Sequence, residues 1–465
     1  MGIVGGGLAG GMVPSISLFA GRDFVSKRPL VKKFRSVAVE ALLKEIASFL
    51  PDKELAWLFE NCFPNTLDTT VDFSMKNGEP DTFVITGDIN AMWLRDSSAQ
   101  VWPYLSLANQ DPDLKLLLKG VINRQAKCIL IDPYANAFNK SKSGSGWKSD
   151  LTEMKPELHE RKWEIDSLCY PVRLAYGYWK STGDGTVLQG NWKKAALLIL
   201  QTFSEQQRKS GNGPYHFQRR TETPTDTVPL SGYGNPTRKV GLIHSMFRPS
   251  DDACLYPFLV PANLFAVQSL KQLSEIADEI WLDQELKKRF LSLAKEVQDA
   301  IEQHAIVIHP DFGKVYAYEV DGFGNYLFMD DANVPSLLSL PYLGAVDHQN
   351  EVYQNTRKMV LSSSNPYFFE GTKAKGIGGP HVGLEMIWPL SLIIQGLTTS
   401  NELELNYCIA SLKATHAGTG FMHESFHMNA PERYTRSWFA WANTLFGELI
   451  YRVYKENPTM LQKQF

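Results

Sequence analysis

Apolar residues recur at helical spacing along most of the chain. Between positions 34 and 50, Val39, Leu42, Leu43 and Ile46 lie three or four residues apart and Pro51 follows, which predicts an amphipathic helix that ends before the proline. Further helices are predicted at about 53–61, 96–108, 113–131, 165–182, 190–208, 252–276, 280–304, 331–342, 350–362, 383–396, 402–413 and 433–455.

Strand-like alternation is limited to short pieces such as 82–86 and 314–320, too little for a sheet of alternating strands and helices. The pattern therefore predicts an all-α protein with short strands in its loops. Successive helices form hairpins of about 60 residues, and such hairpins could pair into a closed ring, an (α/α)6 toroid or barrel.

The first 30 residues differ from the rest. They are apolar and rich in glycine up to Gly21, and a basic region runs from Arg22 to Lys33. Residues 5–10 fit the nucleotide-binding pattern G-x-G-x-x-G, but no strand precedes them. The apolar N-terminal stretch as a whole resembles the apolar part of an export signal of twin-arginine type. We therefore expect a leader over 1–30, one catalytic domain over 31–465, and an exported, periplasmic protein, with the cytoplasm as the alternative.

Charge and composition narrow the class of partner. The 47 Lys and Arg balance 50 Asp and Glu without a block of one sign, which favours neither nucleic acid nor an anionic membrane surface. No run of 18 apolar residues is present, and the 5 cysteines contain no C-x-x-C pair. Aromatic residues make up 12%, which suits sugar stacking and a large helical core equally. We expect a monomer that binds a neutral substrate and uses no cofactor.

Several predicted loops combine acids with Arg, His, Trp or Asn. They lie at 87–97, 247–253, 328–333 and 376–381, and the same mixture recurs at 418–427 and 434–443. Each could be a capped helix start, since Ser250 or Asp330 as N-cap would stabilise a helix by about 1 kcal/mol. Together they are typical of the rim of a pocket for a polar substrate.

One of these stretches, from His423 to His427, has the form H-E-x-x-H. In zinc peptidases this pattern lies on a helix, where both histidines bind the metal and the glutamate activates water. Here Gly420 and Pro431 leave barely one helical turn, and no third ligand follows nearby. A zinc metallopeptidase is therefore an alternative, and we expect no metal.

A pair of carboxylates is the other interpretation of the same glutamate. Glycoside hydrolysis needs one acid to protonate the leaving oxygen and one carboxylate to activate water or attack, about 6.5–9.5 Å apart for inversion. Glu424 is one candidate. By their context, the candidates for the second group are Asp251, Asp252, Asp96, Asp330, Asp331 and Asp166.

These segments resemble glycoside hydrolase family 125, the exo-acting α-1,6-mannosidases. The resemblance covers about residues 55–450 and rests on Gly87-Asp-Ile-Asn-Ala-Met-Trp-Leu-Arg-Asp-Ser-Ser98, Phe247-Arg-Pro-Ser-Asp-Asp-Ala253, Gly378-Gly-Pro-His381, Gly420-Phe-Met-His-Glu-Ser-Phe426 and Thr435-Arg-Ser-Trp-Phe-Ala-Trp-Ala-Asn443. It implies an (α/α)6 toroid and a single-step inverting mechanism without a metal ion. It also implies release of terminal non-reducing α-1,6-linked mannose from glycans such as trimmed N-glycans.

The resemblance also implies roles for residues. Glu424 falls on the general base, and the general acid falls on Asp251 or Asp252, between which the sequence does not choose. The remaining residues of the mannose site would be Trp93 as a stacking face, Arg95 and Asp96 as hydrogen-bonding groups, and His381, His423 and Asn443. A further alternative is a toroid that binds glycans in this pocket without cleaving them.

Overall fold

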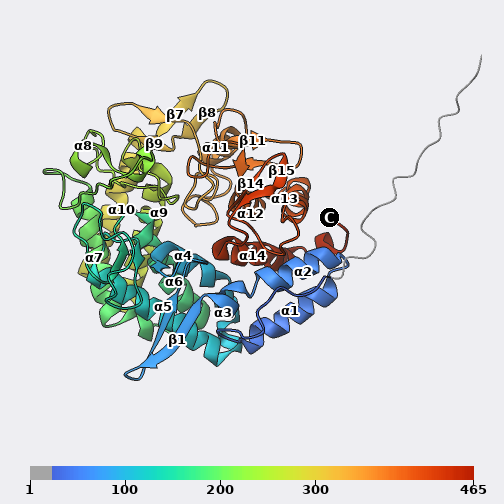
Figure 1. Ribbon diagram of the computed structural model, residues 1–465. Helices are drawn as coiled ribbons and strands as arrows, with labels where there is room; N and C mark the ends of the chain where they lie inside the picture. Colours follow the sequence, from blue (N-terminus) through green and yellow to red (C-terminus); the bar gives the residue numbers. More distant parts are fainter. Residues whose placement is uncertain (1–23) are drawn as a thin grey trace, which may run out of the picture.

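The computed structural model describes residues 24–465, which form an (α/α)6 barrel. Figure 1 shows the chain running around a ring, so that the last long helix, α14 (Ala440–Glu456), returns beside α2 (Lys53–Cys62). Within the ring, α4 (Leu94–Val101) packs against α6 (Asp166–Thr182), and α6 packs against α9 (Val260–Glu279). On the other side, α14 contacts both α4 and α12 (Pro389–Leu397), which closes the ring.

Burial separates inner from outer helices. Every residue of α4 and of α12 is buried, because these helices are covered on all sides. By contrast, α10 (Gln284–His304) packs on α9 and buries a single stripe that includes Phe290, Leu293 and Val297. The other helices are α1 (Val37–Phe49), α3 (Asn65–Thr69), α5 (Pro112–Ile131), α7 (Asn191–Gln206), α8 (Pro229–Gly232), α11 (Glu351–Val360) and α13 (Glu402–Ala414), with 3₁₀ turns η1 (Trp102–Gln110), η2 (Thr186–Leu188), η3 (Pro224–Asp226) and η4 (Pro458–Leu461).

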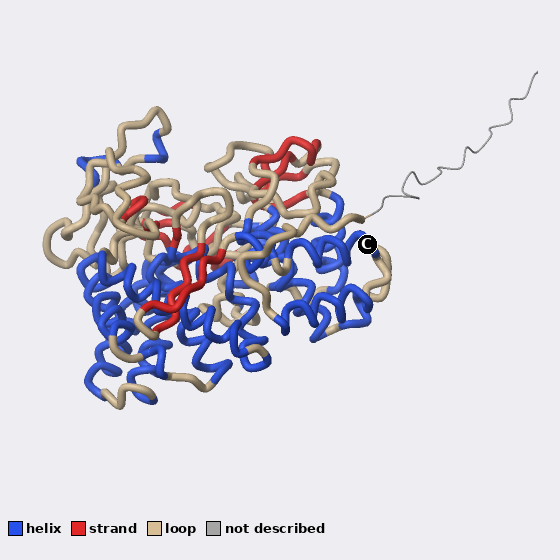
Figure 2. The backbone as a smooth tube through the Cα atoms, turned by 60° about the horizontal axis from the view of Figure 1, so that its bottom comes forward, coloured by secondary structure: helices blue, strands red, loops and turns tan. Residues whose placement is uncertain are grey.

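Short antiparallel strands lie in the connections between helices. Figure 2 shows most of them, with the long loops, gathered at one end of the barrel. The paired sets are β1 (Val71–Lys76) with β2 (Glu79–Val84); β3 (Met92–Trp93) with β4 (Ala137–Phe138) and β5 (Leu158–Glu160); β10 (Tyr326–Leu327) with β9 (Glu319–Val320) and β6 (Phe258–Leu259); β7 (Ile306–His309) with β8 (Gly313–Tyr316); β11 (Phe368–Glu370) with β12 (Lys375–Ile377); and β13 (Met386–Ile387) with β14 (Ser425–His427) and β15 (Ala430–Thr435).

Most predicted helices are confirmed, but three begin later than the sequence pattern indicates. The helices α9, α12 and α14 start at Val260, Pro389 and Ala440 instead of near 252, 383 and 433. In each case a short strand, β6, β13 or β15, occupies the preceding residues. The spacing of apolar residues cannot distinguish such a strand from the first turn of a helix, because over a few residues both give a short run of buried side chains.

The helix predicted at 331–342 is wrong, since this segment consists of turns. The Asp330 carboxylate accepts the backbone N–H of Leu337 at 2.8 Å and of Leu338 at 3.0 Å. Pro335 and Pro341 have no N–H to give to a helix. A side-chain acceptor thus replaces the helical carbonyls that these amides would otherwise use.

The segment before α1 lies against the domain. Phe24 packs on Trp57 with ring centroids 5.4 Å apart, and the guanidinium of Arg28 pairs with Asp68 at 2.6 Å and with Glu40 at 2.7 Å. Residues 24–30, which the sequence assigns to the leader, therefore contact α2 and its neighbours. The predicted export signal itself lies in residues 1–23, outside the described residues.

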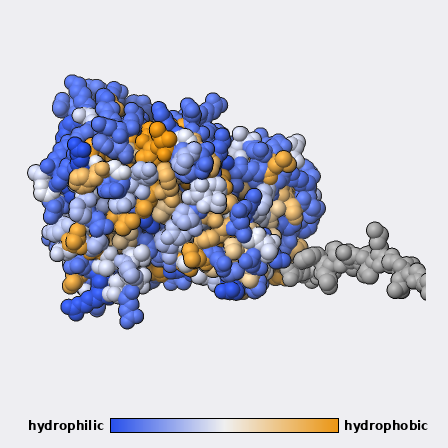
Figure 3. Space-filling view, turned by 90° about the horizontal axis from the view of Figure 1, so that it is seen from above, coloured by the Kyte–Doolittle hydropathy of each residue, from blue (hydrophilic) through white to orange (hydrophobic). Residues whose placement is uncertain are grey.

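Polar side chains predominate on the face drawn in Figure 3, and apolar residues occur there in small patches. Within residues 24–465, no helix combines the length and the apolar character that crossing a bilayer requires. The 5 cysteines are buried free thiols.

Candidate active site

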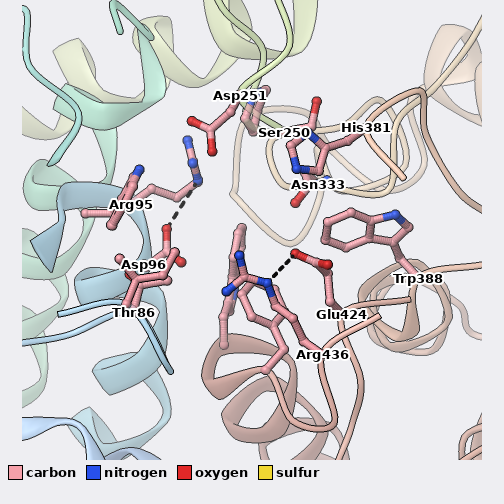
Figure 4. Close-up of a pocket in the computed structure, with 15 residues that line it drawn as sticks. Thr86, Arg95, Asp96, Ser250, Asp251, Asn333, His381, Trp388, Glu424 and Arg436 are labelled. Carbon is pink, nitrogen blue, oxygen red and sulfur yellow. Dashed lines mark ion pairs between the residues drawn. The ribbon is translucent and has the colours of Figure 1, made fainter. Parts of the chain in front are cut away.

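Two joined cavities open at the loop-rich end of the barrel. The inner one has a volume of about 70 Å³, and its side chains come from segments far apart in the sequence (Figure 4). It is lined by Thr86, Ile89, Trp93, Arg95, Asp96, Pro249, Ser250, Asp251, Asn333, His381, Trp388, Glu424, Arg436, Phe439 and Trp441. The ends of several inner helices thus converge on one small polar and aromatic space.

The outer cavity is about ten times larger, at about 700 Å³. Five residues line both cavities and therefore mark the passage between them: Ile89, Trp93, Asp251, His381 and Arg436. Among these five, Asp251 is the only carboxylic acid. Glu424 lines the inner cavity, whereas Asp252 lines the outer one.

Glu424 lies directly before β14, the central strand of the three-stranded sheet β13–β14–β15. Its side chain enters the inner cavity, opposite Asp251 in Figure 4. The Nε of Arg436 lies 3.1 Å from Oε1 of Glu424, and the same guanidinium pairs with Asp88 in the loop before α4. Charge pairing across two loops therefore fixes the direction of the Glu424 carboxylate.

Asp251 belongs to an irregular loop, not to the helix start that the sequence predicts. Its φ of 68° is left-handed, a conformation that costs energy for a residue with a side chain. Lys162 holds this backbone by donating from Nζ to the Asp251 carbonyl at 2.9 Å, and the amide of Asn136 donates to the carboxylate at 3.3 Å. With this turn Asp251 lines both cavities and Asp252 lines only the outer one, so that one acid of the pair reaches the inner cavity.

Asp252 contacts a different set of groups. Ser250 donates from its hydroxyl to the Asp252 carboxylate at 3.1 Å, and Nδ1 of His381 lies 3.7 Å from it. Burial acts to lower the pKa of His381, but Asp252, Asp251 and Glu424 outweigh it and raise this pKa to about 9. His381 is therefore a cation between the acids at neutral pH.

A buried acidic cluster lies beside Asp251. The Nη1 of Arg95 contacts Glu164 at 2.7 Å and Asp166 at 3.1 Å, and its Nε lies 3.6 Å from Asp96. Burial raises the pKa of Glu164 well above its ordinary value and that of Asp96 to about 6. One guanidinium cannot neutralise this many carboxylates, so protons remain in the cluster at neutral pH.

Asp251 and Glu164 lie close enough to influence each other's pKa. Burial acts to raise the pKa of Asp251, but the charges of Lys162 and Arg95 and a hydrogen bond with Glu164 outweigh it and lower this pKa. These opposite shifts favour the proton on Glu164 and the charge on Asp251.

Trp93, Arg95 and Asp96 line the inner cavity, next to each other on β3 and the start of α4. All three are buried, and Arg95 is already paired with the acids beneath it. Their contacts with a sugar stay predictions.

His423 and Asn443 line neither cavity. The ring of His423 stacks on Tyr434 at 3.9 Å between centroids and 4° between planes. Asn443 accepts the backbone N–H of Met422 at 2.7 Å and donates to Asn65 at 3.1 Å. These contacts fix the segment that carries Glu424 and give both residues a supporting position behind the cavity.

The geometry of the H-E-x-x-H pattern differs from that of a zinc site. Residues 425–427 form strand β14, and the segment from His423 to His427 contains no helical turn of the kind that brings both rings to one ion in zinc peptidases. His427 instead pairs with Glu385 at 3.2 Å. In the part of the chain that the structure describes, no group of three or more His, Cys, Asp or Glu side chains is arranged to hold a metal ion.

The remaining candidate acids support loops. Asp331 accepts the hydroxyl of Ser250 at 3.0 Å and the backbone N–H of Asn333 at 2.9 Å, which connects two cavity-lining loops. Asp330 binds the amides of 337 and 338 as described above. Neither lines the inner cavity.

Sequence reasoning did not find Lys162 and Glu164. They belong to the charged run at 160–166, which by its composition is typical of a solvated surface segment. One feature of the sequence could have identified them. The charged run directly precedes the apolar helix α6, so when this helix is buried in the barrel the charged side chains beside it are buried too.

Fold and site together define a glycoside hydrolase with an (α/α)6 barrel. Residues 52–451 match the family described as metal-independent alpha-mannosidase, and the chain belongs to this family, glycoside hydrolase family 125.

The chain is also similar to individual proteins and to solved structures. The chain is 44% identical over 451 residues to the meiotically up-regulated gene 157 protein of Schizosaccharomyces pombe, covering 93% of this chain and 88% of that protein. A metal-independent alpha mannosidase of Streptococcus pneumoniae, solved as a non-productive complex with α-1,6-mannobiose, has a TM-score of 0.88 at 42% identity, with 91% and 100% of the two chains covered. A family 78 rhamnosidase of Bacillus sp. GL1 shares only the fold, at a TM-score of 0.51 and 11% identity, over 92% of this chain and 36% of that one.

Proposed function

We propose that this protein is an inverting exo-α-1,6-mannosidase in which Asp251 is the general acid and Glu424 the general base. The observation that supports this assignment most directly is that Asp251 lines both cavities. In an exo-acting enzyme the sugar to be released fills the inner cavity and the leaving group fills the outer one, so the bond that breaks lies in the passage between them. Asp251 is the acid that lines this passage.

The base belongs on the opposite side of the released sugar. Glu424 faces Asp251 across the inner cavity and lines only that cavity (Figure 4). A water molecule between Glu424 and the anomeric carbon would attack from the face opposite the leaving group, which inverts the configuration. Arg436 holds the carboxylate that accepts the proton from this water.

The acid needs a proton when the bond breaks. We infer that in the free protein this proton resides on Glu164, whose pKa is raised while that of Asp251 is lowered. A sugar that fills the inner cavity removes water from Asp251 and so favours its neutral form. We infer that the proton then passes from Glu164 to Asp251 and from Asp251 to the leaving oxygen. The proton from the attacking water goes to Glu424 and then to solvent.

The size difference between the cavities, about 70 Å³ against about 700 Å³, supports exo action, in which a single sugar occupies the smaller space. Mannose and the α-1,6 linkage are supported by the family and by the ligand of the pneumococcal relative.

The test uses α-1,6-mannobiose and proton NMR. We expect hydrolysis in which β-mannose is the first product from the non-reducing end. α-Mannose as the first product would refute inversion, and no hydrolysis of any α-mannoside would refute the function. A trisaccharide labelled at its reducing end should lose one mannose at a time, and internal cleavage would refute exo action.

A further inference from the structure

Trp147 lies exposed on the wall of the outer cavity, away from the residues that the proposed reaction uses. It belongs to the loop between β4 and β5, and 46% of its surface is exposed. A large aromatic side chain in a groove that leads to a sugar site is a candidate contact for carbohydrate.

One face of the indole is covered. The guanidinium of Arg219 lies over the ring at 3.8 Å from its centroid. Although Arg219 covers this face, about half of the side chain stays exposed, and the ring lines the outer cavity. Cation–π contact with a buried arginine holds the ring in one orientation.

Arg219 is itself immobile. Its Nε and Nη2 donate to both oxygens of Asp150 at 2.8 and 2.7 Å, and it also pairs with Glu160 at 2.8 Å and with Asp226 at 3.0 Å. Lys162 contacts the same carboxylate oxygen of Asp226 at 2.8 Å. The outer wall is thus a network of ion pairs that continues to the Asp251 loop, which Lys162 also holds.

The backbone of the Trp147 loop is fixed as well. Trp147 donates its N–H to the His159 carbonyl at 2.8 Å, and Asp150 donates its N–H to the Trp147 carbonyl at 3.0 Å. Gly146 has a φ of 97°, and a Cβ there would lie 2.3 Å from the His159 carbonyl oxygen, so only glycine fits. A stacking surface that is rigid before binding loses little entropy when a ligand arrives.

We propose that Trp147, backed by Arg219, is the stacking surface of an outer subsite that binds a sugar of the leaving group beyond the residue next to the cleaved bond. A cavity of about 700 Å³ falls in the range of sites that enclose a ligand of several rings, and it is about ten times larger than the inner cavity. The hydroxyls of Thr223 and Thr225 in the same cavity can bond the hydroxyls of that sugar. The preferred substrate is therefore an oligosaccharide of at least three sugars. This inference rests on the proposed exo-mannosidase function.

The experiment compares substrates in Trp147→Ala, Trp147→Phe and the wild type. The substrates are an α-1,6-linked mannotriose, which reaches the outer subsite, and α-mannosyl fluoride, which fills only the inner cavity. We expect the ratio of kcat/KM for the trisaccharide to kcat/KM for the fluoride to fall about three- to tenfold in Trp147→Ala, the scale of one lost stacking contact. Trp147→Phe should restore most of the ratio.

Phe323→Ala is the matched control, since Phe323 is an exposed aromatic residue that lines neither cavity. Its ratio should equal that of the wild type. An unchanged ratio in Trp147→Ala, or an equal fall on both substrates, overturns the subsite. Inactivity of the wild type on both substrates refutes the proposed function instead.

A binding measurement tests the subsite without turnover. With Glu424→Gln as the common background, Trp147→Ala should weaken trisaccharide binding in calorimetry about three- to tenfold. Equal affinity in both proteins contradicts the proposal.

Discussion

The Nε of Arg436 lies 3.1 Å from Oε1 of Glu424, while the same guanidinium pairs with Asp88 in the loop before α4. This relationship connects the β14–β15 segment with the opposite wall of the inner cavity, and it fixes the carboxylate that we propose as the general base. Residues 88 and 436 are far apart in the sequence, so only closure of the ring brings them together.

Arg436→Gln should lower kcat by up to about 10²-fold, because a base that is misplaced by about 1 Å loses its alignment with the attacking water. Asp88→Asn is the matched control, since it removes the outer partner and leaves the contact with Glu424 intact. Steady-state kinetics on α-1,6-mannobiose measure both. An equal loss in the two variants would indicate that the loop contact, and not the direct pair, positions Glu424.

Glu424→Gln should reduce kcat by about 10²–10⁴-fold, the usual contribution of a positioned base, while mannobiose binding persists. His427→Gln is the control, because His427 pairs with Glu385 outside both cavities. It should retain activity close to that of the wild type. A large loss in His427→Gln would revive a metal role for this pattern.

Asp251→Asn should lose about 10²–10⁴-fold on α-1,6-mannobiose but little on 2,4-dinitrophenyl α-mannoside, whose leaving group departs without a proton. Asp252→Asn should not show this dependence on the leaving group, because its carboxylate lies at the outer cavity beside His381. The reverse pattern would assign the acid to Asp252.

Glu164→Gln should move the pH optimum to lower pH. Glutamine keeps a hydrogen bond to Asp251 but cannot hold a proton, while Lys162 and Arg95 continue to lower the pKa of Asp251. The acid is then neutral only at lower pH, so kcat/KM on mannobiose falls on the alkaline side of the profile first. The pH optimum for hydrolysis of 2,4-dinitrophenyl α-mannoside should not shift, because its leaving group departs without a proton. An unchanged profile on mannobiose would remove Glu164 from the proton path.

The ion pair of His381 with Asp252 should contribute to the free energy of unfolding in a pH-dependent manner. Its pKa of about 9 in the folded protein exceeds the ordinary 6.5, so the contribution is complete below about pH 6.5 and is lost as the pH rises through about 9. Because 38% of the side chain is exposed, solvent screens the pair and we expect about 1 kcal/mol at most. Thermal unfolding of wild type and His381→Gln between pH 6 and 10 should show Tm values that converge at high pH. A constant difference would contradict this charge state.

Regular helices were predictable where a single apolar stripe faces the core. The spacing in α10 shows this, since its buried residues recur every three or four positions. Prediction failed where side chains replace backbone hydrogen bonds, as Asp330 does at 337 and 338, and where a short strand precedes a helix, as β6 does before α9. Both effects depend on hydrogen-bond partners that the spacing of apolar residues does not reveal, namely side-chain acceptors and strands distant in the sequence.

The sequence by itself determined the all-α class and the segments that carry Glu424, Trp93, Arg95 and the Asp251–Asp252 pair, because these follow from periodicity and from local residue types. Only the tertiary structure decided that Asp251 reaches the passage between the cavities while Asp252 turns to the outer one. It also brought Glu164 and Lys162 beside Asp251 and placed His423 and Asn443 behind the site. The physical reason is that charge, burial and proton sharing depend on distances between side chains, and closure of the helical ring sets those distances.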